Sequence, residues 1–122
     1  MTPSDLLDQT TLQNLVDLDD GSHGLLAEMI VIFRDDTPRR LQDILSAATR
    51  GDAEELSRAA HALKGGAGAL GARALQELAS DLEALGRGGS AAAGPELGLR
   101  LETCFQASLA ALQAYVSDLQ GR

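Results

Sequence analysis

One histidine, one lysine and three glycines fall within eight residues of the sequence: His61, Lys64, Gly65, Gly66 and Gly68. An unprotonated imidazole is a nucleophile near neutral pH, and an ammonium one helical turn away can offset the charge of a phosphoryl group. Glycine inside a helix costs about 0.5–1 kcal/mol relative to alanine, so three glycines need a reason beyond the fold. Close approach of another surface supplies that reason. The segment therefore indicates a nucleophile with open space beside it.

The element that must position His61 is a helix. Asp52 and Glu55 have the spacing of a capping box, which predicts where this helix begins. Its apolar positions alternate four and three apart and form a core stripe of Leu56, Ala60, Leu63, Ala67 and Leu70. At about 100° per residue, His61 lies about 100° from Ala60 and 160° from Leu63, outside that stripe. We expect His61 to be exposed and to share its face with Ser57, Lys64, Gly65 and Gly68.

Apolar residues at helical spacing predict four further helices. The first covers about Thr11–Leu18 and is capped by Thr10, and a longer one covers about Ser22–Thr49. Pro38 lies inside the long segment, where we expect either a kink or two shorter helices meeting near Thr37. The helix that follows the one with His61 carries Leu75, Leu78, Leu82 and Leu85, and the last helix covers about Glu96–Gln120.

Short connections between long amphipathic helices predict an all-α fold, an antiparallel up-down four-helix bundle with a short additional N-terminal helix. That short helix would cap one end of the bundle. We expect a single domain over residues 1–122, with a flexible glycine- and alanine-rich loop at about residues 86–95. The aromatic fraction of 2% means that Leu and Ala must fill the core.

Composition narrows the classes of partner and the cellular compartment. A net charge of -8 disfavours nucleic acid, whose phosphates need cations. Cys104 is the single cysteine and allows no intrachain disulfide, which suits a reducing cytoplasm. No apolar run approaches the roughly 20 residues of a membrane helix, and residues 1–8 lack the features of a secretion signal. We therefore expect a free-standing cytoplasmic domain that does not bind a membrane.

The motif around His61 resembles the signature of histidine-containing phosphotransfer (HPt) domains. The matching features are Ala60-His61-x-Leu63-Lys64-Gly65, Gly71, Leu82-Glu83, the stretch Phe33–Pro38, Gly51-Asp52 and Gly86-Arg87. In that family the histidine accepts a phosphoryl group from an aspartyl phosphate on a receiver domain and passes it to another receiver. The resemblance implies that His61 is the phosphoacceptor, that Lys64 stabilises the phosphoryl group and that Gly65 provides steric clearance.

The other expectations about the site concern clearance, docking and cofactors. Gly68 shares the face of His61 and is a second clearance residue, while Ser57, Arg58 and Ala62 form a candidate docking face. We expect a monomeric phosphocarrier with no cofactor of its own and no kinase activity toward ATP. The Mg²⁺ that usually serves phosphoryl transfer would belong to the receiver domain, in a response regulator or a hybrid sensor kinase.

Several other interpretations compete with this one. Gly66 and Gly68 could instead permit close helix packing, and the chain could be a helical adaptor that binds or sequesters a partner with His61 incidental. A di-iron bundle needs Glu-x-x-His pairs, and Arg58 stands three residues before His61. One cysteine and two distant histidines predict no metal site, and no G-x-x-x-x-G-K-[ST] loop for nucleotide phosphates is present. His23 lacks the lysine and glycine context and is read as a surface residue.

Overall fold

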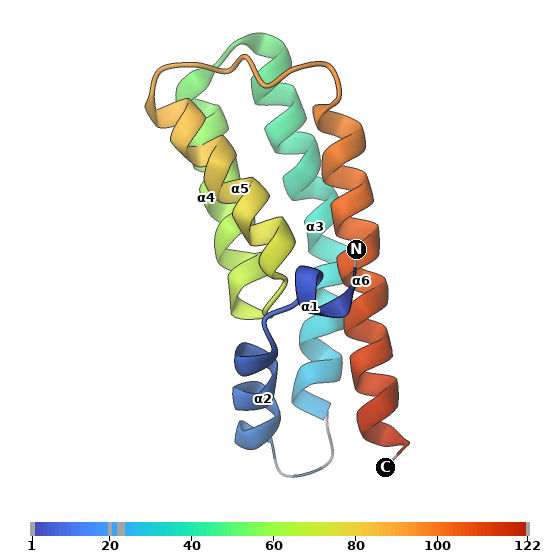
Figure 1. Cartoon of the computed structure of the whole chain (residues 1–122). Helices are drawn as coiled ribbons and strands as arrows, with labels where there is room; N and C mark the ends of the chain where they lie inside the picture. Colours follow the sequence, from blue (N-terminus) through green and yellow to red (C-terminus); the bar gives the residue numbers. More distant parts are fainter. Residues whose placement is uncertain (1, 20, 22–23, 122) are drawn as a thin grey trace.

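The computed structural model describes residues 2–19, 21 and 24–121. Within these residues the chain forms six helices and no strand: α1 (Pro3–Leu6), α2 (Gln9–Leu18), α3 (Gly24–Arg50), α4 (Ala53–Ala69), α5 (Arg73–Arg87) and α6 (Leu97–Gln120). The last four run alternately up and down and pack against one another in chain order, with α6 returning to α3 (Figure 1). The expected all-α fold, an antiparallel four-helix bundle, is confirmed.

Two long helices, α3 and α6, run most of the length of the molecule (Figure 1). The hairpin of α4 and α5 covers one half of them, and α2 lies beside the other half. Phe33 of α3 and Phe105 of α6 pack with their ring centroids 5.3 Å apart, and leucine and alanine make up most of the remaining core. A continuous apolar interior therefore holds α4 and α5 in place.

Helix α4, which carries His61, begins and faces the core as predicted. The carboxylate of Asp52 accepts a hydrogen bond from the backbone N–H of Glu55 at 3.0 Å, which caps the helix. All five positions of the expected core stripe are buried: Leu56, Ala60, Leu63, Ala67 and Leu70. The rotation of the helix about its own axis is fixed by this stripe.

The N-terminal region differs from the expectation in its first helices. Asp8, not Thr10, caps α2, because its carboxylate accepts from the backbone N–H of Thr10 at 3.0 Å and of Thr11 at 3.3 Å. The single turn of α1 was not expected from the sequence. Its start is stabilised by the backbone N–H of Thr2, which donates to the carboxylate of Asp5 at 3.1 Å.

Helix α1 and the residue that caps α2 are attached to the turn between α4 and α5 and to the first residue of α5. The backbone N–H of Asp8 donates to the carbonyl of Gly71 at 2.8 Å, and the guanidinium of Arg73 donates to the carbonyl of Ser4. Gly71 has φ +74°, and a Cβ there would lie 3.1 Å from the Asp8 carbonyl, so only glycine fits this contact without strain. Helix α2 lies alongside α3. Its first turn meets the turn between α4 and α5, since a Cβ at Gly71 would lie 3.3 Å from Thr11 and 3.4 Å from Leu12, so the short helix covers this end of the α4–α5 hairpin.

Helix α3 is continuous through Pro38, so the expectation of two helices meeting near Thr37 is wrong. Proline removes one backbone donor, but Phe33, Thr37, Leu41 and Ile44 on both sides of it are all buried against the other helices. The burial of these side chains outweighs the loss of one backbone hydrogen bond at Pro38. The expected start at Ser22 and the surface position of His23 lie outside the described residues.

The connection between α5 and α6 begins later than expected. Gly86 and Arg87 belong to α5, and the loop begins at Gly88. Its flexibility stays a prediction, as does the single-domain boundary at residues 1–122. No helix in the described part of the chain is long and apolar enough to cross a membrane.

Candidate functional site

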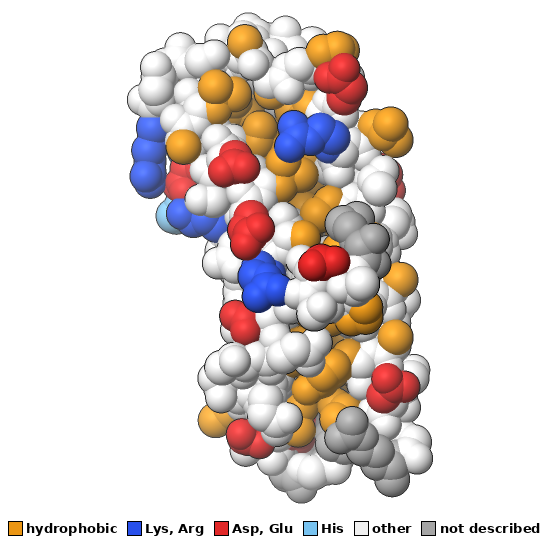
Figure 2. All heavy atoms as spheres, in the orientation of Figure 1, with side chains coloured by type: hydrophobic (Ala, Val, Ile, Leu, Met, Phe, Trp, Pro, Cys, Tyr) orange, Lys and Arg blue, Asp and Glu red, His pale blue; other side chains and the backbone are white. Residues whose placement is uncertain are grey.

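His61 lies on the outer face of α4, next to α5. Its neighbour Ala60 and the nearby Leu63 are buried, whereas 67% of the His61 side chain is exposed. The position outside the core stripe, predicted from helical geometry, is confirmed. Figure 2 shows the described histidine in pale blue at one edge of the molecule, beside basic side chains.

A buried carboxylate from the neighbouring helix holds the imidazole. Glu83 lies on α5 with only 4% of its side chain exposed, and its Oε2 is 2.6 Å from Nδ1 of His61. Its other oxygen, Oε1, accepts a hydrogen bond from Nζ of Lys64 at 2.6 Å. Nη2 of Arg87, one turn further along α5, donates to Oε2 at 3.0 Å. One carboxylate therefore organises His61, Lys64 and Arg87.

This arrangement distinguishes the two nitrogens of the His61 ring. An ionised carboxylate can only accept hydrogen bonds, so Nδ1 must carry the proton that lies between it and Glu83. In the neutral ring the other nitrogen, Nε2, then has the free lone pair. Because the side chain is mostly exposed, Nε2 is the nucleophilic atom available to a partner.

Sequence reasoning did not assign a role to Glu83. The resemblance to HPt domains includes Leu82-Glu83 and Gly86-Arg87, but it implies no role for Glu83. The interaction joins residues 22 positions apart on two helices, so no local spacing reveals it.

The surroundings of Glu83 favour its ionised form. The hydrogen bond from Lys64 is the largest cause that lowers the pKa of Glu83, with further contributions from His61 and Arg87, while burial acts in the opposite direction. The carboxylate is therefore ionised near neutral pH and remains an acceptor for Nδ1.

This lowered pKa predicts a pH-dependent contribution of Glu83 to stability. Because the pKa is lower in the folded chain than in the unfolded chain, the contribution is complete above about pH 5 and is lost as the pH falls through the folded-state value. We expect the difference in free energy of unfolding between wild type and Glu83→Gln to shrink on acidification. Urea titrations at several pH values measure it, with the exposed Glu77→Gln on the same helix as the control. A difference that stays constant from pH 7 to pH 3 would contradict the assignment.

The glycines near His61 have different surroundings. A Cβ at Gly65 would meet no atom within 4 Å, so this position leaves open space one turn from His61. A Cβ at Gly66 would lie 3.6 Å from the guanidinium of Arg40, and one at Gly68 would lie 2.7 Å from Nε2 of Gln76. Gly68 thus makes room for a side chain of α5, which is the helix-packing alternative. A role of Gly68 in phosphoryl clearance stays a prediction.

The three residues of the candidate docking face differ in how far they are exposed. Arg58 and Ala62 are exposed, and Arg58 pairs with Glu54 at 3.3 Å and with Glu55 at 3.8 Å. Ser57 is half-buried, and its backbone N would lie 2.7 Å from a Cβ at Gly86. Ser57 therefore also packs in the contact between α4 and α5. The docking role of Ser57, Arg58 and Ala62 stays a prediction.

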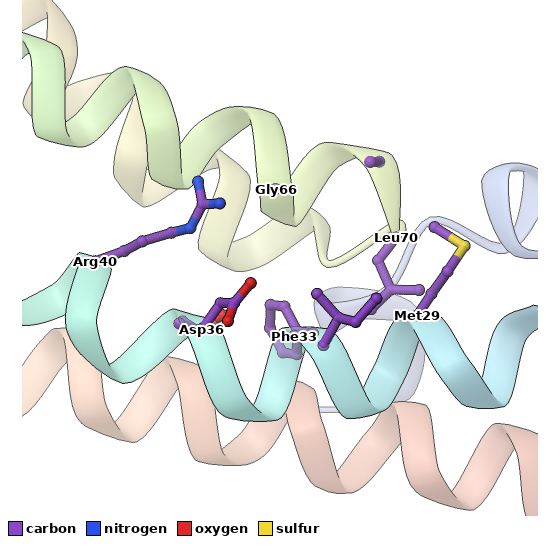
Figure 3. A pocket seen from close by; sticks show the side chains of 9 residues that line it. Met29, Phe33, Asp36, Arg40, Gly66 and Leu70 are labelled. Carbon is purple, nitrogen blue, oxygen red and sulfur yellow. The ribbon is translucent and has the colours of Figure 1, made fainter.

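A groove of about 210 Å³ lies between α3 and the side of α4 that faces away from α5. Figure 3 shows Met29, Phe33 and Leu70 at its apolar end and Asp36 and Arg40 at the other, with Gly66 on the wall formed by α4. Nη1 of Arg40 crosses to the carbonyl of Ala62 at 2.6 Å. The exposed face of α4 is thus bordered by Glu83 on one side and by this groove on the other.

Among the residues that the structure describes, no three His, Cys, Asp or Glu side chains gather where they could hold a metal ion. The polar groups at the site are the imidazole of His61, the buried carboxylate of Glu83 and the cations of Lys64 and Arg87.

Comparisons with known proteins agree with this geometry. A model of the Hpt domain family matches residues 28–120. Among solved structures, the histidine-containing phosphotransfer domain of ArcB from Escherichia coli is similar in fold, with 20% sequence identity, a TM-score of 0.72 and coverage of 94% of this chain and 96% of that one. A comparison with curated protein sequences gave no match. Members of the Hpt domain family are phosphocarriers in two-component signalling and not kinases. Because the family model covers most of the length of this chain, the chain belongs to the Hpt domain family.

Proposed function

We propose that the chain is a phosphorelay intermediate that accepts a phosphoryl group on Nε2 of His61 from the aspartyl phosphate of one receiver domain and passes it to another. The observation that carries this proposal is the exposed imidazole whose Nδ1 is held by buried Glu83 at 2.6 Å. A neutral ring oriented in this way presents a nucleophile without further rearrangement.

The proposed loading step transfers one phosphoryl group between two side chains. The lone pair of Nε2 attacks phosphorus, a P–N bond forms, and the bond between phosphorus and the aspartyl oxygen breaks. The aspartate leaves as a carboxylate, and the proton on Nδ1 stays where it is, hydrogen-bonded to Glu83. Delivery to a second receiver is the same step in reverse.

Lys64 is placed to serve this step without leaving Glu83. An ammonium has three donors, and one of them is used at 2.6 Å on Oε1 of Glu83. With 31% of its side chain exposed, Lys64 can direct another donor to a phosphoryl oxygen on His61. This geometry supports the phosphate-stabilising role proposed for it.

The receiver would approach the exposed face of α4. The small residues Ala62, Gly65, Gly66 and Ala69 are all exposed there and allow close approach of another backbone or helix. The receiver would bring its own acidic pocket and Mg²⁺, the ion that usually serves phosphoryl transfer. We propose a monomer that works in the cytoplasm, uses no cofactor of its own and has no kinase activity toward ATP.

The open space at Gly65 predicts a steric effect that does not require unfolding. We expect Gly65→Leu to slow phosphoryl transfer from a loaded receiver at least about tenfold, because the new side chain occupies the approach to His61. Stability should not fall, since replacing a helical glycine removes a penalty of about 0.5–1 kcal/mol. Stopped transfer reactions and urea titrations measure the two effects, with Gly65→Ala as the smaller matched variant. Transfer at the wild-type rate in Gly65→Leu would show that the glycine is not a clearance residue.

Radiolabel transfer tests the proposed function itself. Purified protein incubated with ATP and Mg²⁺ alone should remain unlabelled, whereas receivers carrying labelled aspartyl phosphate should load it with acid-labile phosphate. Label from ATP in the single protein would contradict the carrier role. No label from a broad panel of loaded receivers, several of which nevertheless bind the chain, would favour the adaptor.

A further inference from the structure

The hydrogen bond between Glu83 and His61 has a consequence for the phosphorylated ring. Once Nε2 carries a phosphoryl group and Nδ1 keeps its proton, the ring is positively charged. Such a ring leaves phosphorus as neutral imidazole. If the proton on Nδ1 is lost first, the leaving group is an imidazolate anion, which is far poorer, so this proton controls how readily the P–N bond breaks.

We propose that Glu83 retains the Nδ1 proton of phosphorylated His61 and thereby keeps the phosphoryl group transferable. This positioning role rests on the proposed function and concerns the release step. The buried carboxylate lies 2.6 Å from Nδ1, and hydrogen bonds between ionised partners are roughly twice as strong as neutral ones.

The charged groups around the ring make Glu83 necessary for this purpose. Lys64 on α4 and Arg87 on α5 both contact Glu83 and would repel a positively charged ring if the carboxylate were absent. Arg58, one turn before His61, is paired with Glu54 and Glu55. From α3, Arg40 reaches the carbonyl of Ala62. Among these charged groups Glu83 is the carboxylate that contacts the imidazole. Its removal leaves the cations of Lys64 and Arg87 near the ring without their shared partner.

The release step balances in atoms and charge. An oxygen of the acceptor, a receiver aspartate or water, forms a bond to phosphorus while the P–N bond breaks. The bonding electrons return to Nε2, and the proton on Nδ1 remains. Neutral His61 is restored in the tautomer that the next loading step needs.

The test loads the protein without a receiver. Phosphoramidate phosphorylates histidine directly, and a His23→Gln background leaves His61 as the one histidine of the chain. ³¹P NMR then follows the loss of phosphohistidine to water between pH 5 and pH 10. We expect the pH at which the rate falls by half to move down by about one unit in Glu83→Gln. At alkaline pH the variant phosphohistidine should then persist about tenfold longer.

Two further variants test the proposal. One should shift the pH profile in the opposite direction, and the other should leave it unchanged. Arg87→Ala removes a cation beside the same carboxylate from a side chain that is 68% exposed, so it should move the profile up while the fold persists. Glu77→Gln removes a charge from an exposed position of α5 and should leave the profile unchanged. Circular dichroism reports whether Glu83→Gln is folded.

The outcomes separate this inference from the proposed function. Coincident profiles for wild type, Glu83→Gln and Arg87→Ala would overturn the role of Glu83, even if receivers load His61 normally. Should Glu83→Gln fail to fold, an unchanged or downward profile in Arg87→Ala would overturn it. Shifted profiles in a chain that no receiver loads would keep the role of Glu83 and reject the relay.

Discussion

His61→Gln should reduce phosphate uptake from a loaded receiver at least about 100-fold relative to wild type. A glutamine side chain has no nitrogen lone pair that can attack phosphorus. The fold should be unaffected because 67% of the His61 side chain is exposed, and surface substitutions usually change the free energy of unfolding by no more than about 0.5 kcal/mol. Glu83 keeps Lys64 and Arg87 as partners in the variant.

The measurement is acid-labile label on the purified protein after incubation with a loaded receiver, together with a thermal melt. His23→Gln is the matched control and should load like wild type, since it removes the chain's other histidine. Label that persists in His61→Gln would move the phosphoacceptor elsewhere. A melting temperature many degrees lower would contradict the surface position of the side chain.

Gly86→Ala should be the most destabilising of the glycine substitutions considered. A Cβ at this position would lie 2.6 Å from the carbonyl oxygen of Ala53 and 2.7 Å from the backbone N of Ser57. Both are backbone atoms of α4, so the two helices must separate, and overpacking of this kind costs about 1–3 kcal/mol or more. Gly86 is on the same helix as Glu83, so displacement of α5 should also weaken the contact with His61 and slow transfer.

Urea titration of Gly86→Ala and Gly65→Ala isolates the packing effect. Both variants add one methyl group to a helical glycine, but the space at Gly65 is open, and there we expect a gain of about 0.5–1 kcal/mol. Equal effects of the two substitutions would contradict the close contact between α4 and α5.

The features that could be predicted from the sequence are those that repeat within one helix. The core stripe of α4 follows from the four and three spacing of its leucines and alanines, and the exposure of His61 follows from the same geometry. The capping of α4 by Asp52 is likewise local, because donor and acceptor are three residues apart. These features needed no knowledge of the neighbouring helices.

What could not be predicted depends on contacts between helices. Glu83 reads as an ordinary charged residue next to the buried Leu82 until α5 is placed against α4. Gly86 looks like the start of a glycine-rich loop, but it is a helical residue whose missing side chain allows close packing. Pro38 predicts a break by its local chemistry, and the buried residues around it override that preference.

The attachment of the first helices to the turn at Gly71 also determines in what order the molecule can assemble. The hairpin of α4 and α5 is closed by a three-residue connection, whereas Ser4 and Arg73 are 69 positions apart. Closing long loops costs more entropy and slows folding, so the hairpin should form early and the N-terminal helices should dock onto it late. In the native state we expect α1 and α2 to detach by a local opening that requires less free energy than global unfolding, because few contacts join them to the other helices. Their amides should then exchange with solvent before those of α4, and His61 and Glu83 should remain paired while they do.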